Sequence, residues 1–158
     1  MAIYQRSFEV HAPLADVVAF HDDPASLTGI TPPPVRVTVE RFDAPVHVGS
    51  QIVFTLYVGL IRVRWQAEIV EYEATRYFRD VQVSGPFGAW THTHTFTASA
   101  DATIVSDRVE YQPPLGRLGK WLDPLLVRPA LAYLFRFRAR QTCQLLEQHG
   151  GLIESLDL

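Results

Sequence analysis

The sequence is poor in cysteine and lysine, and it has no long apolar run. Cys143 is the only cysteine among 158 residues, which excludes a disulfide framework and a cysteine metal cluster. Lys120 is the only lysine and the net charge is −3, so the composition gives no footprint of binding to nucleic acid or anionic membranes. No apolar run reaches the roughly 20 residues that a membrane span needs, and residues 1–10 lack the apolar core of a signal peptide. We therefore expect a cytoplasmic protein without nucleic-acid partners or integral membrane contact.

The composition is that of one globular domain. Hydrophobic residues make up 47% of the chain and charged residues 20%, which excludes intrinsic disorder. A chain of this length can bury a sizeable core. We expect a single domain over residues 1–150 and a short acidic tail over residues 151–158, because Gly150 and Gly151 should end the last helix. The sequence indicates no oligomeric state.

Two long segments alternate between apolar and polar residues and predict a β-hairpin. Gly59-Leu60 suits the two-residue turn between residues 51–58 and residues 61–72. Weaker alternation predicts further strands over residues 4–11 and 35–40. With this turn, one face of the hairpin is apolar throughout and carries Ile52, Phe54, Leu56, Val63, Trp65 and Ala67.

Helical patterns follow the first strand and close the chain. Pro13 suits the first turn of a short helix that begins at Leu14, and residues 24–30 predict a second short helix. From Leu115 onward the apolar residues recur with helical period, which predicts a long C-terminal helix with a kink or restart near Pro129. The stripe that we expect to face the sheet is Leu126, Ala130, Tyr133, Leu134, Phe137, Gln141, Leu145 and Gln148.

The segment over residues 78–114 organises the chain, because it places a polar row on an otherwise apolar sheet face. It predicts three strands, and residues 90–97 alternate aromatic or histidine side chains with threonine. Strands alternate faces with period two, so the threonines form the outer face. The expected inward row is Asp80, Gln82, His92, His94, Asp107 and Tyr111.

The turn at residues 85–88 predicts which residues lie opposite one another. Gly-Pro-Phe-Gly fits a three-residue hairpin with a bulge, which pairs Asp80 with His94 and Gln82 with His92. A slip of two residues would change these partners but not the face. Across the next turn, the expected pairs are Trp90 with Tyr111, His92 with Val109, and His94 with Asp107.

Two stretches are the most specific in the chain. They are Ile30-Thr31-Pro32-Pro33 and the motif F-x-D-x-Q-x-x-G-P-F-x-x-W-x-H-x-H-x-F over residues 78–96, which Asp107, Tyr111 and Pro114 follow. Together with the order of elements, they resemble the START-like superfamily, in its polyketide cyclase/dehydrase branch. The resemblance covers nearly the whole chain.

This resemblance implies an α+β helix-grip fold with a deep apolar cavity. A curved antiparallel sheet of six to seven strands would wrap around the long C-terminal helix, with two short helices after the first strand. The superfamily includes lipid carriers, hormone receptors and aromatase/cyclases, so the fold does not settle the function.

We expect a START-like binding protein for a hydrophobic or amphipathic small molecule, held for binding or transport between the sheet and the last helix. The apolar end of the cavity would hold a ring or acyl part, and the polar row would orient a polar group. No cofactor is expected. The expected ligand-binding residues are Phe54, Leu56, Val63, Trp65, Ala67, Gln82, Trp90, His92, His94, Phe96, Asp107, Tyr111, Tyr133 and Phe137.

An alternative function is that of a polyketide aromatase/cyclase or dehydratase. Such chemistry needs a base beside a carbonyl and an acid that releases water. The candidate catalytic residues are His94, Asp80, His92 and Tyr111. The same residues also suit a structural hydrogen-bonded network, so the sequence leaves enzymatic activity open. A third function, protein binding through the outer strand face, fits poorly with a threonine-rich, charged surface.

The spacing of His92 and His94 also suits a metal site. Two imidazoles from one strand could bind one zinc ion, with Asp80 or Asp107 completing the set. We expect no metal, because no second ligand pair with metal spacing occurs in the sequence. The predicted pairing puts two carboxylates beside His94, and we expect them to outweigh burial and raise the pKa of His94 above about 6.5.

Overall fold

Residues 1–153, the part of the computed structural model whose backbone is described, form a seven-stranded antiparallel sheet and four helices. Side chains are described for residues 1–147. The strands are β1 (Ala2–Val10), β2 (Arg36–Phe42), β3 (Gln51–Val58), β4 (Ile61–Glu73), β5 (Tyr77–Ser84), β6 (Ala89–Ser99) and β7 (Ala102–Gln112). The helices are α1 (Leu14–Asp22), α2 (Ser26–Gly29), α3 (Gly116–Leu122) and α4 (Val127–Ile153).

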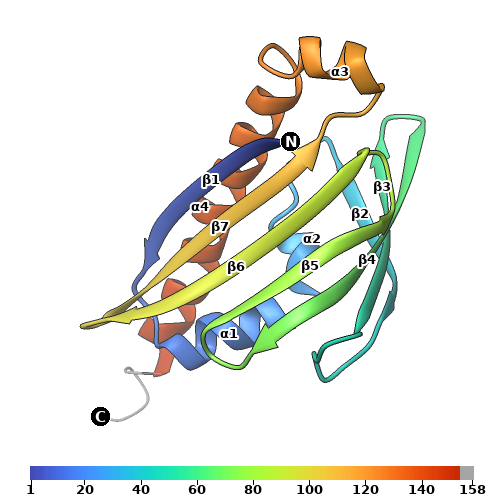
Figure 1. Cartoon of the computed structure of the whole chain (residues 1–158). Helices are drawn as coiled ribbons and strands as arrows, with labels where there is room; N and C mark the ends of the chain where they lie inside the picture. Colours follow the sequence, from blue (N-terminus) through green and yellow to red (C-terminus); the bar gives the residue numbers. More distant parts are fainter. Residues whose placement is uncertain (154–158) are drawn as a thin grey trace.

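This arrangement confirms the predicted helix-grip fold. Strands β2 to β7 follow one another as a meander, and β1 pairs with β7, which gives the order β1-β7-β6-β5-β4-β3-β2. Figure 1 shows the sheet curving in front of α4, with α1 and α2 also behind it. We call the face of the sheet toward these helices the inner face. No helix in the described part of the chain is long and apolar enough to cross a membrane.

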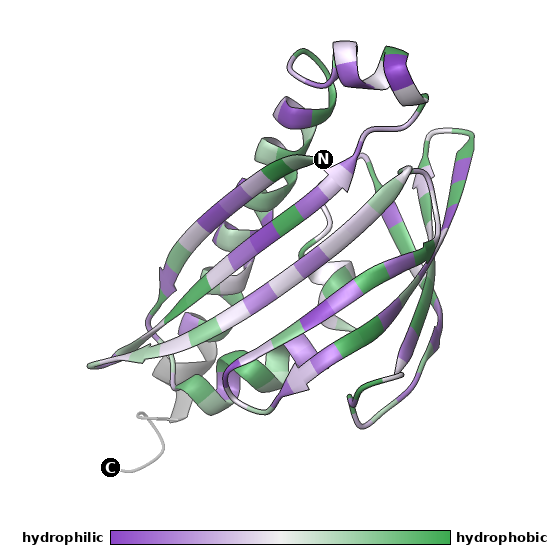
Figure 2. Cartoon of the chain, viewed as in Figure 1, coloured by the Kyte–Doolittle hydropathy of each residue, from purple (hydrophilic) through white to green (hydrophobic). Residues whose placement is uncertain are grey.

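Two of the three predicted strand pairings agree with the structure residue by residue. In the hairpin of β3 and β4, Phe54 lies opposite Trp65, and their rings stack with centroids 5.8 Å apart. In the pair of β6 and β7, His94 lies opposite Asp107. Hydrophobic and hydrophilic residues alternate along the strands in Figure 2, as a sheet with one buried face requires.

The predicted pairing of β5 with β6 is wrong by two residues. Asp80 lies opposite His92, and Phe78 lies opposite His94. The cause is Gln82, whose side-chain amide donates to the Phe87 carbonyl oxygen at 2.8 Å and accepts from the Phe87 amide at 3.3 Å. This side chain closes the loop where the prediction had backbone pairing. Because the slip is two residues, Asp80 and both histidines remain on the inner face.

The predicted stripe of α4 is also wrong. The residues that pack against the sheet are Leu131, Phe135, Ala139 and Thr142, all at most 5% exposed. By contrast, Tyr133 is 54% exposed, and Phe137 is half-buried. Apolar side chains occupy two adjacent sides of this helix, so periodicity alone did not identify the packed side. The Phe135 ring decides it, because it packs 5.3 Å from the rings of both Tyr4 and His92.

The end of α4 lies further along than predicted. The helix continues to Ile153, past the expected end at Gly150 and Gly151. Residues 154–158 of the predicted acidic tail lie outside the described residues.

The packing of α4 makes a direct stability prediction. Replacing Phe135 by alanine should lower the free energy of unfolding by about 3–5 kcal/mol, since a large ring leaves a cavity between helix and sheet. Replacing Tyr133, two residues earlier and half exposed, should cost less than about 1 kcal/mol. Urea denaturation of both variants measures the difference. A larger loss for Tyr133→Ala would mean that the originally predicted stripe faces the sheet.

Candidate functional site

A cavity of about 510 Å³ lies between the inner face of the sheet, α4, and the segment from α1 to β2. Side chains of β3 to β6 form one wall and those of α4 the opposite wall. Its lining includes Ile30, Pro32, Pro33, Ile52, Phe54, Leu56, Val63, Trp65, Ala67, Ile69, Phe78, Phe87, Trp90, Ala130, Leu131 and Leu134, all of them apolar. A volume of this size holds a drug-sized molecule.

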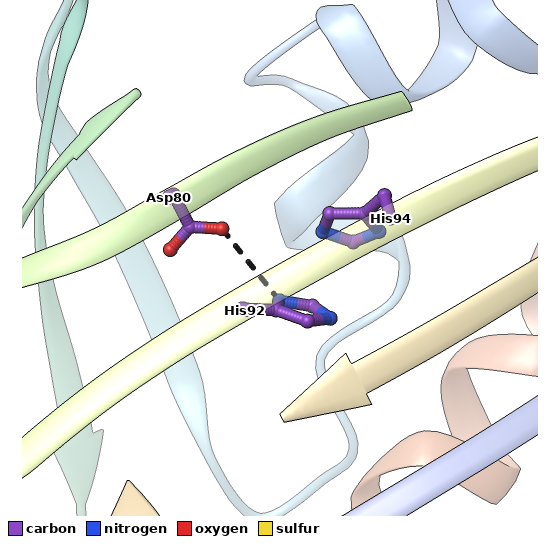
Figure 3. A group of neighbouring side chains, drawn as sticks. All are labelled: Asp80, His92 and His94. Atoms are coloured by element: carbon purple, nitrogen blue, oxygen red, sulfur yellow. Dashed lines mark ion pairs between the residues drawn. The ribbon is translucent and has the colours of Figure 1, made fainter. Parts of the chain in front are cut away.

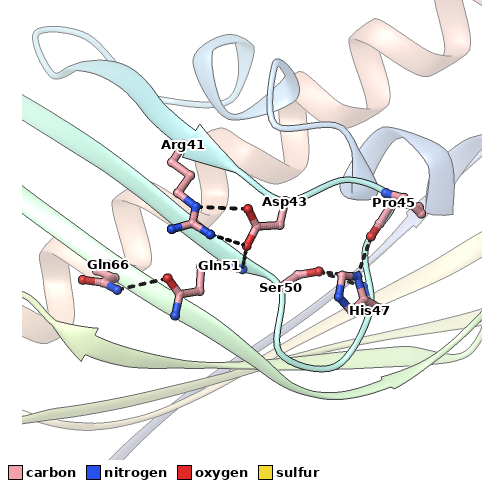
Figure 4. A network of polar contacts seen from close by, with 7 residues as sticks. All are labelled: Arg41, Asp43, Pro45, His47, Ser50, Gln51 and Gln66. Atoms are coloured by element: carbon pink, nitrogen blue, oxygen red, sulfur yellow. Dashed lines mark hydrogen bonds and ion pairs between the residues drawn. The ribbon is translucent and has the colours of Figure 1, made fainter.

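The loop between β2 and β3 contributes to the cavity wall and is held by polar contacts (Figure 4). Asp43 accepts hydrogen bonds from the Arg41 side chain at 3.0 Å and from the Gln51 amide at 3.1 Å. The Ser50 hydroxyl lies 2.9 Å from Nδ1 of His47. These contacts stiffen a loop whose Val46, Ser50 and Gln51 line the cavity.

Aromatic rings pack together in the apolar part of the cavity. Trp65 and Trp90 meet edge to face with ring centroids 5.2 Å apart, and Phe87 lies 4.8 Å from Trp90. Phe87 reaches this position because the Gln82 side chain holds the loop between β5 and β6. Edge-to-face pairs of this kind add stability beyond their buried area. The apolar part of the cavity is therefore built from mutually supported rings.

The polar part of the cavity contains Asp80, His92 and His94 (Figure 3). Asp80 comes from β5 and the histidines from β6, two residues apart and therefore on one face. Nδ1 of His92 lies 3.7 Å from Oδ2 of Asp80. The two imidazole rings have centroids 3.8 Å apart.

Asp107 of β7 lies behind the two histidines and outside the cavity lining. Its Oδ1 lies 3.1 Å from Nε2 of His92, which donates a hydrogen bond, and 2.9 Å from Nδ1 of His94, which is not aligned for one. Burial alone would raise the pKa of Asp107, but the contacts with His92 and His94 outweigh it and hold that pKa far below its usual range. Asp107 is thus the ionised group of the cluster.

The predicted rise in the pKa of His94 is wrong. Burial lowers the pKa of His94, and the neighbouring His92 lowers it further, despite Asp107 and Asp80. Burial likewise lowers the pKa of His92 and raises that of Asp80 to about 6. The reason is that the cluster is dry, and desolvation penalises every charged form within it.

This arrangement could support two kinds of chemistry. Neutral imidazoles beside a carboxyl group of pKa about 6 are the groups that general acid–base catalysis uses. The ligand atoms of Asp80, His92 and His94 also lie within 4.8 Å of one another, so these three are the residues that could hold a divalent metal ion.

The structure brings most of the predicted site residues to the cavity. Those that line it are Phe54, Leu56, Val63, Trp65, Ala67, Asp80, Trp90, His92, His94 and, at half-exposed depth, Tyr133. Those outside its lining are Gln82, Phe96, Asp107, Tyr111 and Phe137.

The residues outside the lining have other contacts. Phe96 packs in the core beside Phe78, with ring centroids 6.1 Å apart. The hydroxyl of Tyr111 donates to Asp123 at 2.8 Å. Burial and this hydrogen bond raise the pKa of Tyr111 above its usual value. These positions follow from the inward face of β6 and β7 extending beyond the cavity.

The sequence prediction missed two residues of the polar end, His21 and Arg138. We expected His21 to be a helix-end residue beside acidic neighbours. Instead its Nδ1 lies 2.7 Å from the Val17 carbonyl oxygen, and its ring packs 5.7 Å from His94 and 5.0 Å from Phe96. Arg138 was expected on the solvent side of α4, and the correct helix phase would have placed it inward.

A sequence model of the family described as polyketide cyclase/dehydrase and lipid transport matches residues 1–147. The chain belongs to this family. The match confirms the resemblance found in the sequence motifs and agrees with the helix-grip fold. No curated protein sequence matches the chain.

Solved structures share the fold at low sequence identity. A protein from Chromobacterium violaceum has 18% identity and a TM-score of 0.75, with 93% of this chain and 99% of that chain covered. The di-domain ARO/CYC StfQ of steffimycin biosynthesis has 12% identity and a TM-score of 0.73, with 94% and 51% covered. A Thalictrum norcoclaurine synthase mutant bound to a transition-state analogue has 15% identity and a TM-score of 0.65, with 94% and 96% covered. At these identities, the likeness extends to the fold alone.

The burial of His21 predicts an acid-sensitive contribution to stability. Burial, with His94 second, lowers the pKa of His21 to about 4, whereas an unfolded histidine titrates near 6.5. Between these values the unfolded chain binds more protons, so stability that His21 leaves intact above pH 6.5 is lost as pH falls toward 4.

The difference in unfolding free energy between wild type and His21→Gln should therefore shift against the wild type across this pH window. The slope should be at most about 1.4 kcal/mol per pH unit. Urea denaturation at several pH values measures it, and Asp80, which titrates in both proteins, cancels. Exposed His11, replaced by glutamine, is the control. A pH-independent difference for His21→Gln would contradict a buried, neutral His21.

Proposed function

We propose that the protein binds a hydrophobic or amphipathic small molecule in the cavity between the sheet and α4. The observation that carries this proposal is a cavity of about 510 Å³ whose walls are apolar except for one cluster of titratable side chains. Small-molecule sites typically combine an apolar lining with a few placed polar groups. The family match, whose description includes lipid transport, supports the same class of function.

The division of the cavity suggests how such a ligand lies. A ring or acyl body would contact Phe54, Trp65 and Trp90, whose side chains bury apolar surface most effectively. A polar group would reach the histidines and Asp80, where hydrogen-bonding atoms face the cavity. We favour binding over the aromatase/cyclase alternative, because the candidate acid Tyr111 bonds to Asp123 outside the cavity lining.

This function predicts that a neutral apolar probe binds in the cavity. N-phenyl-1-naphthylamine should bind with micromolar affinity, about −8 kcal/mol, and its fluorescence should rise. Ala67→Trp should abolish binding, because Ala67 is 2% exposed on the cavity wall and an indole would fill the space. Fluorescence titration measures both affinities.

The neighbouring Glu68 on the outer face provides a matched control, and Glu68→Trp should bind the probe like the wild type. Should Ala67→Trp fail to fold, Val63→Phe fills the same wall from a half-buried position. Probe binding that persists in a folded Ala67→Trp or Val63→Phe protein would show that the ligand lies elsewhere. No binding by the wild type would refute the proposed function.

A further inference from the structure

Arg138 places a positive charge at the polar end of the cavity. It follows Leu131 and Phe135 on the packed side of α4 by seven and three residues, so its side chain lies on the side that faces the sheet. It lines the cavity together with Leu134, one turn earlier. Its guanidinium carbon lies 5.4 Å from the centre of the Phe135 ring. Burial lowers the pKa of Arg138, yet an arginine side chain stays protonated in proteins.

This guanidinium has no direct partner. Nε of Arg138 is buried without a hydrogen bond, and no carboxylate oxygen of the described residues lies within 4.0 Å of its nitrogens. The contrast with the surface is clear, because several exposed arginines do hold a carboxylate: Arg41, Arg64, Arg76, Arg79 and Arg108. A buried charge without a partner is costly, so Arg138 is a cation that lacks its counter-ion.

The two buried carboxylates facing Arg138 do not fill this role. Both act on it only at longer range, where their charges raise its pKa. Asp107 is committed to His92 and His94 through one oxygen. Asp80 lies beside His92, and burial raises its pKa to about 6. The fork of donors on Arg138 is therefore left facing the cavity.

We propose that Arg138 binds a carboxylate of the ligand, so that the cavity takes an amphipathic carboxylic acid with an aryl or acyl body. This inference rests on the proposed function and specifies its ligand class. A planar guanidinium matches a carboxylate through two parallel hydrogen bonds, which a neutral ester cannot reproduce. The apolar walls beside Arg138 then contact the rest of the acid.

The test compares acids with their own esters. 2-Naphthoic acid and decanoic acid, each beside its methyl ester, compete with N-phenyl-1-naphthylamine at pH 8, where the acids are ionised. For at least one pair, the wild type should bind the acid ten-fold or more tightly than the ester, a difference of about 1.4 kcal/mol. Arg138→Gln should bring the ratio of the two dissociation constants close to one. Arg136→Gln, an exposed arginine on the same helix, should keep the wild-type ratio.

Each outcome decides the inference. If the probe binds but both acids bind no better than their esters, the role of Arg138 is refuted while the proposed function stands. An acid preference that survives in Arg138→Gln places the anion elsewhere and also refutes it. If neither the probe nor any of the four compounds binds, the proposed function and this inference fail together. Arg138→Met, of similar length, replaces Arg138→Gln if circular dichroism shows that the glutamine variant is unfolded.

Discussion

One oxygen of Asp107 fixes the polar end of the cavity. It lies within 3.1 Å of a ring nitrogen of His92 and of His94, and so holds two neighbouring imidazoles from the strand beside it. The opposite sides of these rings are left for the cavity and for Asp80. The positions depend on the pairing of β6 with β7, which puts Asp107 across from His94. A change in that pairing would separate the carboxylate from both rings.

The same burial has opposite effects on the groups of this cluster. Asp107 overcomes desolvation because two imidazoles contact it directly, while His92 and His94 share a single acceptor between them. Arg138 has no direct contact at all and keeps its charge because of its chemistry. The cavity therefore contains one satisfied anion, neutral imidazoles and one cation without a partner. This imbalance distinguishes the site from an ordinary buried hydrogen-bonded network.

Strand alternation was enough to predict the fold, the inner face and the apolar wall. The hairpin of β3 and β4 could be placed because two alternations agree in phase about Gly59-Leu60. The pairing of β5 with β6 could not, since it depends on a hydrogen bond from the Gln82 side chain to a loop backbone that no periodicity reports. Helix α4 carries apolar residues on two sides, so its packed side depended on how Phe135 fits the sheet. Arg138 was missed for the same reason.

The pKa of His94 could not be predicted from neighbours in sequence alone. The direction depends on how dry the cluster is, and dryness arises from parts of the chain far apart, including His21 on α1 and Phe135 on α4. Counting nearby carboxylates gives one term of the balance and omits the other.

The pairing of β1 with β7 joins the two ends of the chain, with Ala2 opposite Tyr111. Contacts between residues so far apart in sequence slow folding, because a long loop must close before they form. The two walls of the cavity are separated in the same way, since β3 to β6 precede α4 by dozens of residues. During synthesis on the ribosome, the cavity is therefore incomplete until most of α4 has emerged. A chain truncated within this helix would retain strands and histidines but have no enclosed volume.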